Sequence, residues 1–392
     1  MIPFRRSLAD FGPSLIRAVF DAAPPGALNM GLGMPDIEVP ASVRAAARAE
    51  LETGRAPYSP NAGRAALRER IAAMYQAWSA TEGVATWASA EGVIVTVGAE
   101  EALYVALASL CEPGETILVP DPGFPAYAMI ARCVGARVKT YALRPEEGFR
   151  PTAAALLEAL TPDTRAVVLG SPANPTGAMI DPQELELITL ALASAGVPWV
   201  SDEIYDRYTW SGPIVSPGRF SDQGIVVSGL SKSAGVMGWR LGWLMVPAGQ
   251  ARIPTAVHQS VCSCASTLSQ AGAVAAIDAL MGQGPDAGFI DGVRALFRER
   301  RRRALDAVEG LGLSCAPADG AFYLFVDVRP HLKEGEDDVA LCRRLASEEG
   351  VIVVPGQAFG EGGRGWVRLA YTCDAVEEGV ARLGRGLGLG AQ

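Results

Sequence analysis

The stretch that decides the fold is Ser228–Trp243, which reads SGLSKSAGVMGWRLGW. A short apolar run at 225–227 precedes it and is typical of a buried strand, and a second apolar run follows at 241–246. Between these runs Lys232 lies in a turn rich in glycine and serine, and Arg240 follows. A lysine at a strand end, next to hydroxyls and a guanidinium, suits the binding of a phosphate-bearing aldehyde. A surface turn with incidental charges has the same local sequence, so the rest of the chain must decide.

Composition bounds the classes of protein that this chain can be. With 392 residues, 49% of them hydrophobic, the chain is long enough for two or more domains with a sizeable core. The formal net charge of −9 argues against binding nucleic acid through a basic surface. We expect the basic run 298–303 to be the solvated face of a helix. No apolar run is long enough to cross a bilayer without interruption, so no membrane partner is expected.

The cysteines and histidines predict no metal site. The seven cysteines are scattered, and Cys262 and Cys264 are too close together for a usual zinc knuckle. The chain has only two histidines, His258 and His331. Reduced cysteines, together with a start that lacks an apolar signal segment, indicate a cytoplasmic location.

From about residue 91 the chain alternates strand, turn and helix. Strands are predicted at 93–97, 116–120, 137–143, 166–170, 197–200 and 225–227. This rhythm predicts an α/β fold, with a mostly parallel sheet covered by helices on both faces. Polar and glycine-bearing motifs follow the strands at their C-terminal ends, where ligands bind in such sheets.

The flanking regions predict a second, smaller domain. A turn at 58–63 precedes a helix at 64–78, for which Asn61 is the expected N-cap. Beyond residue 284, a long helix at 289–311 leads to a second alternation of strands and helices, typical of a smaller α+β domain. We therefore predict an N-terminal arm with part of the small domain at 1–44, a large domain at 45–287 and the small domain at 288–392.

A pyridoxal phosphate site requires more than a lysine. It requires a carboxylate that keeps the ring nitrogen protonated, and Asp202 at the end of an apolar strand is the candidate, although a turn aspartate looks the same. Asn174 and Tyr205, on loops at strand ends, are candidate partners of the ring oxygen.

The phosphate, the ring face and the substrate need further groups. The helix start at Gly98, Ala99 and Glu100 offers backbone N–H groups to a phosphate. Phe124 is either an aromatic plate for the ring or a core residue. Arg368 is a charged residue among the apolar residues of the last strand. If its side chain points inward, its guanidinium can bind a carboxylate through two hydrogen bonds; if it points outward, it has no role in the site.

Taken together, the motifs resemble the class I/II aminotransferases, the aspartate aminotransferase-like group of fold-type I pyridoxal phosphate enzymes. The resemblance spans nearly the whole chain, in the family's order. It is carried by Gly33–Asp36, Tyr58–Gly63, Asp121–Pro125, Asn174–Gly177, Ser201–Tyr205, Ser231–Lys232, Gly238–Gly242, Gly320–Tyr323, Pro355–Gly356, Phe359–Gly360 and Val367–Leu369.

The resemblance implies a role for each cofactor-binding residue. Lys232 would form the Schiff base and then move the proton between the substrate's Cα and the cofactor. The other roles would be Asp202 on the ring nitrogen, Asn174 and Tyr205 on the ring oxygen, Phe124 stacked on the ring, and Arg240 with the backbone of Ala99 and Glu100 on the phosphate.

The resemblance also implies how substrate and partner are bound. Arg368, with Asn174 and the backbone of Gly33, would hold the substrate's α-carboxylate. Tyr58 would reach the phosphate of a neighbouring subunit, which makes a homodimer the expected functional unit.

Two positions depart from the family pattern. The family often has a phosphate-binding serine three positions before the lysine, and this chain has Gly229 there; whether Ser228 or Ser231 compensates stays open. Glu100 occupies a slot where some dicarboxylate-specific relatives carry lysine. An acid there disfavours aspartate or glutamate and points to an apolar or aromatic donor, with 2-oxoglutarate or pyruvate as acceptor.

The predicted function is therefore amino-group transfer between an L-amino acid and a 2-oxo acid. A pyridoxal phosphate-dependent C–S β-lyase is the alternative, because Lys232 and Asp202 serve either chemistry. A ligand-sensing regulator with a DNA-binding module is disfavoured by the acidic composition.

Overall fold

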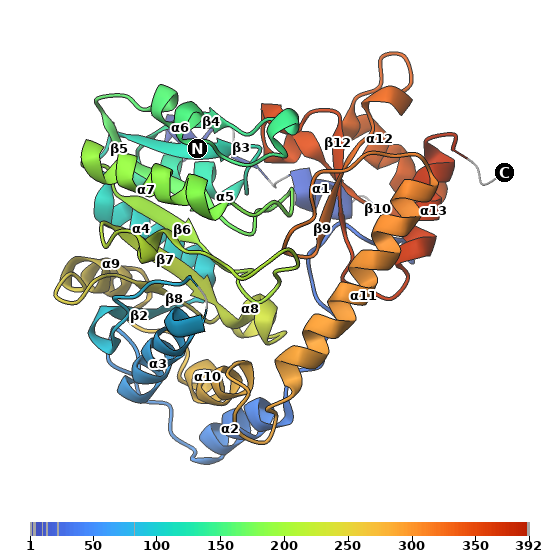
Figure 1. The fold of residues 1–392 in the computed structure, drawn as a ribbon. Coiled ribbons are helices and arrows are strands. Elements are labelled where there is room, and N and C mark those ends of the chain that lie inside the picture. Colours follow the sequence, from blue (N-terminus) through green and yellow to red (C-terminus); the bar gives the residue numbers. More distant parts are fainter. Residues whose placement is uncertain are drawn as a thin grey trace.

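The computed structural model describes residues 2, 5–9, 11–12, 15–21, 23–81 and 83–389. Figure 1 shows the larger sheet with its helices on the left and the smaller sheet on the right. The long helix α11 (Phe289–Gly310) starts near α10 and runs up along the outer side of the smaller sheet to α13. Most predicted strands and helices are present, with ends that shift by a few residues.

Within the described residues, seven strands form the larger sheet in the order β2-β8-β7-β6-β5-β3-β4. Of these strands β8 alone runs antiparallel to its neighbours, so the prediction of a mostly parallel sheet is confirmed. The strands are β2 (Val93–Thr96), β3 (Thr116–Asp121), β4 (Arg137–Ala142), β5 (Thr164–Gly170), β6 (Trp199–Asp202), β7 (Gly224–Gly229) and β8 (Gly242–Met245).

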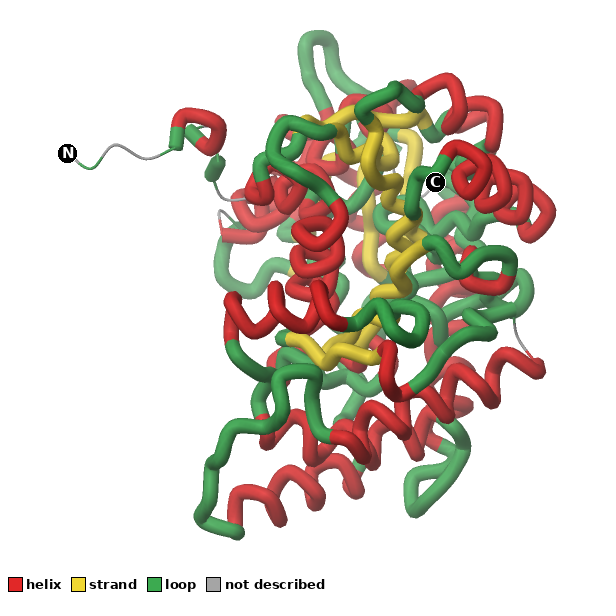
Figure 2. The backbone as a smooth tube through the Cα atoms, turned by 90° about the vertical axis from the view of Figure 1, so that its left-hand side faces the viewer, coloured by secondary structure: helices red, strands yellow, loops and turns green. Residues whose placement is uncertain are grey.

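Helices cover both faces of this sheet because its strands are apolar on both sides. In β3, Leu118 packs into the core on one face, while Ile117 and Val119 pack into the core on the other. One face is covered by α4 (Gly98–Leu110), α5 (Ala126–Val134) and α9 (Arg252–Cys262). The other face is covered by α3 (Ala65–Thr81), α6 (Ala153–Ala159), α7 (Pro182–Ala195) and α10 (Thr267–Leu280). Figure 2 shows the strands as an inner layer between helices.

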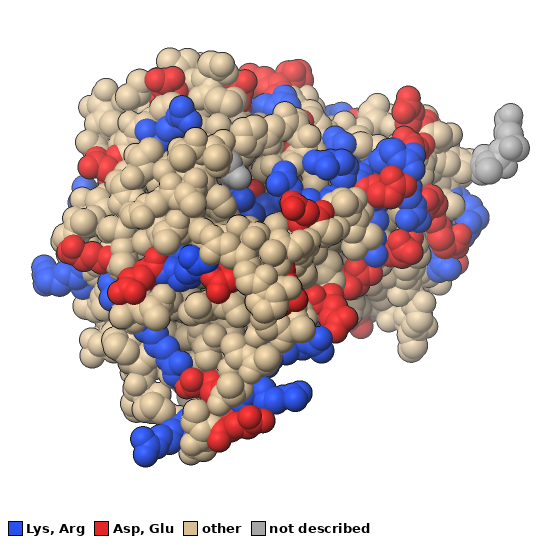
Figure 3. All heavy atoms as spheres, turned by 60° about the horizontal axis from the view of Figure 1, so that its bottom comes forward, with Lys and Arg blue, Asp and Glu red and all other residues tan. Residues whose placement is uncertain are grey.

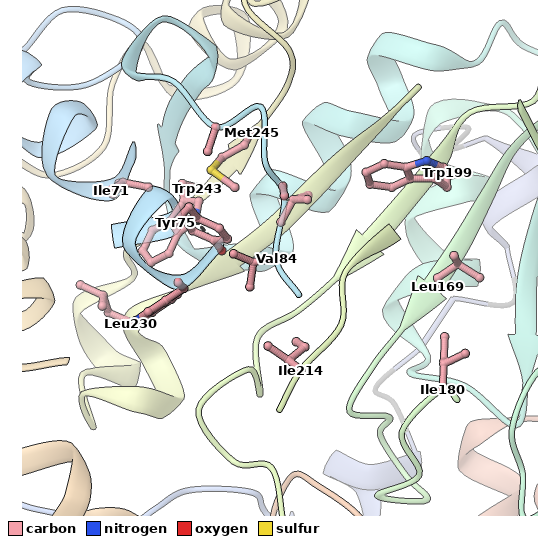
Figure 4. Packing of buried hydrophobic residues seen from close by; sticks show 14 of the residues in the cluster. Ile71, Tyr75, Val84, Leu169, Ile180, Trp199, Ile214, Leu230, Trp243 and Met245 are labelled. Atoms are coloured by element: carbon pink, nitrogen blue, oxygen red, sulfur yellow. Dashed lines mark hydrogen bonds between the residues drawn. The ribbon is translucent and has the colours of Figure 1, made fainter. Parts of the chain in front are cut away.

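The core beneath α3 is built from large side chains. Tyr75 of α3 packs against Trp243 of β8, whose indole Nε1 donates to the Tyr75 hydroxyl at 3.4 Å, and Met245 and Ile71 lie beside them (Figure 4). Both rings are fully buried, so each contributes about 1.5–3 kcal/mol of burial free energy. This packing fixes β8 and the turn that precedes it.

The smaller unit contains a three-stranded sheet in the order β11-β12-β9, and a parallel pair, β1 with β10. Its strands are β1 (Leu28–Asn29), β9 (Tyr323–Asp327), β10 (Val351–Ile352), β11 (Val354–Pro355) and β12 (Trp366–Ala370). Its helices are α1 (Leu15–Asp21), α12 (Asp338–Arg344) and α13 (Val376–Gly386); α2 (Ala41–Glu52) packs instead on α10. The β1–β10 pair places the N-terminal segment with the C-terminal one, while the domain boundaries at 44 and 287 stay a prediction.

Two local expectations from the sequence are wrong. Asn61 does not cap α3: the first free N–H, that of Arg64, donates to Gln270 Oε1 at 2.8 Å, and Asn61 Nδ2 donates to the Ser263 carbonyl. The run 298–303 is not a uniformly solvated face, because Arg300 is only 4% exposed and binds Asp36 at 2.6 Å and the Thr372 carbonyl.

Among the described residues, no helix combines the length and the apolar character that crossing a bilayer requires. On the face seen in Figure 3, acidic and basic side chains lie intermixed.

Replacing Arg300 should destabilise the protein, because Arg300 joins α11 to the N-terminal segment. We expect Arg300→Ala to lower the free energy of unfolding by about 2 kcal/mol, measured by urea denaturation, since Asp36 loses its bidentate partner and the Thr372 carbonyl loses one of its two donors. Arg302→Ala is the matched control, because Arg302 pairs only with exposed acids on the same helix. Equal stability of the two variants would show that the Arg300 contacts do not hold the segment.

Candidate active site

The predicted site residues, except Tyr58, line one cavity of about 250 Å³ between the two sheets. It lies at the C-terminal ends of β5, β6 and β7, as the strand-end motifs predict. The predicted residues that line it are Gly33, Ala99, Glu100, Phe124, Asn174, Asp202, Tyr205, Ser231, Lys232, Arg240 and Arg368.

Lys232 lies in the short helix α8 (Leu230–Ser233), directly after β7. Its Nζ donates to the Gly33 carbonyl at 2.8 Å, and the Tyr208 hydroxyl donates to its backbone carbonyl at 2.8 Å. Burial lowers the pKa of Lys232 to about 8, helped by the positive charges of Arg368 and Arg240. At any given pH, the neutral amine is therefore more populated at Lys232 than at an exposed lysine.

Asp202 is the last residue of β6 and is buried. Tyr127 Oη donates to its Oδ2 at 2.8 Å, and the Ile204 N–H donates to its Oδ1 at 3.2 Å. Burial raises the pKa of Asp202 despite these two bonds. Among the described residues no lysine or arginine pairs with Asp202, so a cationic N–H donor entering the cavity would stabilise its charge.

One end of the cavity lies where α4 begins. The first N–H groups of α4 have no partner within the helix, and Arg240 lies beside them. Gly98 has a φ of +82°, and a Cβ there would lie 2.5 Å from Arg240 Nη2, so only glycine allows this approach.

The structure separates the two serines that the sequence left as alternatives. Ser231 lines the cavity, whereas Ser228 is buried and donates to the Glu203 carbonyl at 3.3 Å. At Gly229 a Cβ would lie 2.9 Å from Gly242 Cα, across the β7–β8 pair. The usual serine therefore does not fit at this position without separating the two strands.

Arg368 in β12 enters the same cavity from the smaller sheet, and it points inward. It is 3% exposed; its Nη1 donates to Asn174 Oδ1 at 2.7 Å and its Nη2 to the Gly31 carbonyl. Its guanidinium carbon lies 4.3 Å from the centre of the Tyr323 ring. Its Nε is buried and has no hydrogen-bond partner among the described residues. A carboxylate bound beside Arg368 would supply both that partner and the missing negative charge.

Two tyrosines of the site, Tyr127 and Tyr323, had no role in the sequence analysis. Tyr127 holds Asp202, and Tyr323 shares a hydrogen bond of 2.7 Å with the hydroxyl of Tyr205. Both residues lie in motifs already quoted or next to them: Tyr127 is three residues after Phe124, and the two rings meet edge to face at 5.6 Å. The available signal was the position of Tyr127 at the start of the helix that directly follows the Phe124 turn.

Tyr58 lies outside the cavity and is 88% exposed. This is compatible with a contact to a second subunit, and its role there stays a prediction. Apart from Tyr58, the chain brings together a lysine of lowered pKa, a buried acid, a buried arginine and a helix start. A ligand with a cationic ring nitrogen and a phosphate fits the acid and the helix start. A substrate with a carboxylate fits the arginine.

Comparisons with known proteins agree with this chemistry. A family described as "Aminotransferase class I and II" matches residues 25–383. A probable N-acetyl-LL-diaminopimelate aminotransferase of Bacillus subtilis is 33% identical over 91% of this chain and 88% of its own length. The valine–pyruvate aminotransferase of Mycobacterium tuberculosis is 34% identical over 91% of this chain and 90% of its own.

Solved structures show the same architecture. An aspartate aminotransferase from Thermus thermophilus with maleate has a TM-score of 0.88 and 31% identity, over 99% of both chains. An aminotransferase from Mycobacterium tuberculosis has a TM-score of 0.89 and 31% identity, over 99% of this chain and 100% of that one. The predicted fold type I is confirmed, and the β-lyase alternative is not favoured, because these relatives are named aminotransferases. The protein is thus an enzyme that transfers amino groups, and the chain belongs to the class I and II aminotransferases.

Proposed function

We propose that this aminotransferase uses pyridoxal phosphate bound through Lys232, and that it moves the amino group of an apolar L-amino acid to pyruvate. The observation that supports the cofactor is one cavity that holds three unusual groups. Lys232 has a lowered pKa, Asp202 is a buried acid of raised pKa, and Arg368 is a buried arginine whose Nε has no hydrogen-bond partner among the described residues. The family implies the same cofactor.

When bound, pyridoxal phosphate supplies a ring that accepts electrons from the carbon being deprotonated. Asp202, held by Tyr127, keeps a proton on the ring nitrogen. Asn174 presents its amide N–H groups to the ring oxygen, since its Oδ1 is occupied by Arg368. The start of α4, Arg240 and Ser231 hold the phosphate.

The proton transfer belongs to Lys232. With cofactor and substrate bound, the neutral amine of Lys232 would take the proton from the substrate's Cα and deliver it to C4′ of the cofactor. Arg368 orients the substrate by binding its α-carboxylate as a fork, so that the Cα–H bond faces the amine. Phe124, which lines the cavity, would cover the ring.

The substrate class is argued from the rest of the cavity wall. Ile16, Leu103, Ile204 and Met237 give it an apolar lining, and Glu100 adds a negative charge. The side-chain carboxylate of an acidic substrate would be repelled by Glu100. It would also lose its hydration beside apolar side chains. The same reasoning disfavours 2-oxoglutarate, which carries a second carboxylate, and favours pyruvate. A relative named valine–pyruvate aminotransferase shows that the family includes such a pairing.

The homodimer belongs to the same proposal. Leu51, Trp239 and Leu268 line a surface groove together with Arg240, which also lines the catalytic cavity, and the Tyr58 side chain is exposed. A second copy on this face would bury these apolar groups and bring its Tyr58 toward the phosphate. We keep a cytoplasmic location as a prediction from the sequence.

Lys232→Ala should abolish covalent cofactor binding and leave the fold intact. The chain has three lysines, so borohydride reduction followed by peptide mass spectrometry should find the cofactor on Lys232 and not on Lys139 or Lys333. We expect turnover to fall at least about 10³-fold, because the amine is also the proton carrier. Lys139→Ala is the control and should keep both the adduct and the rate. An adduct that persists in Lys232→Ala would remove Lys232 from this role.

Arg368→Ala should weaken amino-acid binding. We expect KM for the amino donor to rise roughly 100-fold, since a buried fork to the carboxylate is lost, while the cofactor stays bound. Arg364→Ala is a matched control from the same region, because Arg364 is exposed and pairs with Glu361. An unchanged KM in steady-state kinetics would place the carboxylate elsewhere.

Glu100 should set the discrimination against acidic donors. With pyruvate as acceptor, we expect kcat/KM for valine, leucine or phenylalanine to exceed that for aspartate by about 100-fold. Glu100→Lys should raise kcat/KM for aspartate by roughly tenfold, since one repulsive charge becomes attractive. Glu112→Lys, on the surface, makes the same charge change as a control. A wild-type enzyme that prefers aspartate and 2-oxoglutarate in this panel would overturn the substrate proposal and leave the Lys232 chemistry standing.

A further inference from the structure

A cluster of three metal-ligating side chains lies outside the cavity and has no part in the chemistry above. Glu101 is in the first turn of α4, while His258 and Cys262 are four residues apart on one face of α9. The two helices pack against each other on one face of the larger sheet. The ligand atoms of the three residues all lie within 4.8 Å of one another.

The spacing of these atoms matches the edges of a tetrahedral metal site. Glu101 Oε1 lies 3.0 Å from His258 Nδ1 and 3.3 Å from Cys262 Sγ, and Sγ lies 3.7 Å from Nδ1. Zinc bonds of about 2.0–2.2 Å to nitrogen or oxygen and about 2.3 Å to sulfur imply edges of roughly 3.4–3.6 Å at tetrahedral angles. Shifts of a few tenths of an ångström would therefore place all three atoms around one ion.

The surroundings hold the ligands in place. The Val97 N–H donates to Glu101 Oε2, so Oε1 is left facing the other two side chains. His258 is fully buried, and the Glu101 side chain is 9% exposed. An outer hydrogen bond that fixes a ligating carboxylate is a usual part of metal sites.

Without a cation, the three side chains hydrogen-bond to one another through Glu101 Oε1. Burial would raise the pKa of Glu101, but the hydrogen bonds from His258 and from the Val97 N–H outweigh it and lower that pKa. Burial and then the Glu101 charge raise the pKa of Cys262 to about 12. A divalent cation between the three groups reverses this relation and favours the thiolate.

We propose that Glu101, His258 and Cys262 bind a divalent cation of the zinc class, with one carboxylate oxygen, one imidazole nitrogen and one thiolate as ligands. On binding, the Cys262 thiol releases its proton to solvent, and neutral His258 binds through Nδ1 with its proton on Nε2. Water takes the fourth position. The cation ties α9 to the first turn of α4, which lines the catalytic cavity at Ala99 and Glu100.

The test uses the whole protein and does not depend on the proposed transamination. Protein treated with EDTA and then dialysed is titrated with ZnCl₂; bound zinc is measured by elemental mass spectrometry after gel filtration, and thermal denaturation is followed with and without zinc. We expect one zinc per chain and a rise in Tm, because a ligand that binds only the folded state stabilises it.

Variants separate this site from the other thiols. Cys262→Ser and His258→Gln should each weaken zinc binding by more than about 100-fold and cancel the rise in Tm. Cys133→Ser is the matched control, since Cys133 is also partly buried, and it should keep both. Circular dichroism of each variant confirms folding before titration. Binding well below one zinc per chain, or the same binding in a folded Cys262→Ser or His258→Gln protein, would overturn the proposal.

Discussion

The site depends on charged groups that the fold holds away from water. Asp202, Lys232 and Arg368 come from three different elements, and burial acts against the charged form of each. A buried charge is tolerated only with a partner, and the chain supplies only part of the partners: Tyr127 for Asp202, the Gly33 carbonyl for Lys232. The charges that remain without a full partner are the ones that the proposed ligands would meet: a cationic ring nitrogen at Asp202 and a carboxylate at Arg368.

The cavity forms only where the two sheets pack together, because its residues come from both. Parallel pairing of β5 with β6 and of β6 with β7 brings Gly170, Asp202 and Val227 into line, so the loops after these strands meet at one edge. Arg368 comes from β12 of the smaller sheet, and the contact with Asn174 joins it to the loop after β5. The hydrogen bond between Arg368 and Asn174 therefore depends on the relative position of the two sheets, since a shift between them would separate the two side chains.

The sequence predicted the larger sheet and most of the polar residues of the cavity, because its polar motifs follow apolar strands and the geometry of parallel sheets brings strand ends together. It failed where a contact depends on residues far along the chain. Arg300 looks like one of several helix-surface arginines until Asp36 is placed beside it, and no local pattern shows that Gln270 takes the capping role expected of Asn61. The contact between Glu101 and Cys262 is of the same kind, because these residues are 161 positions apart and no local pattern brings them together.

The long helix α11 has a mechanical consequence. Its first turn packs through Ile290 into the core of the larger sheet, while Phe297, Ala304 and Val308 pack into the core of the smaller one. At 1.5 Å per residue, its 22 residues make a rod of about 33 Å. A rod of that length acts as a lever: a tilt of about 5° at its first turn displaces the far end by about 3 Å. A change in the packing of Ile290 would therefore be enlarged along α11 before it reaches the core of the smaller sheet.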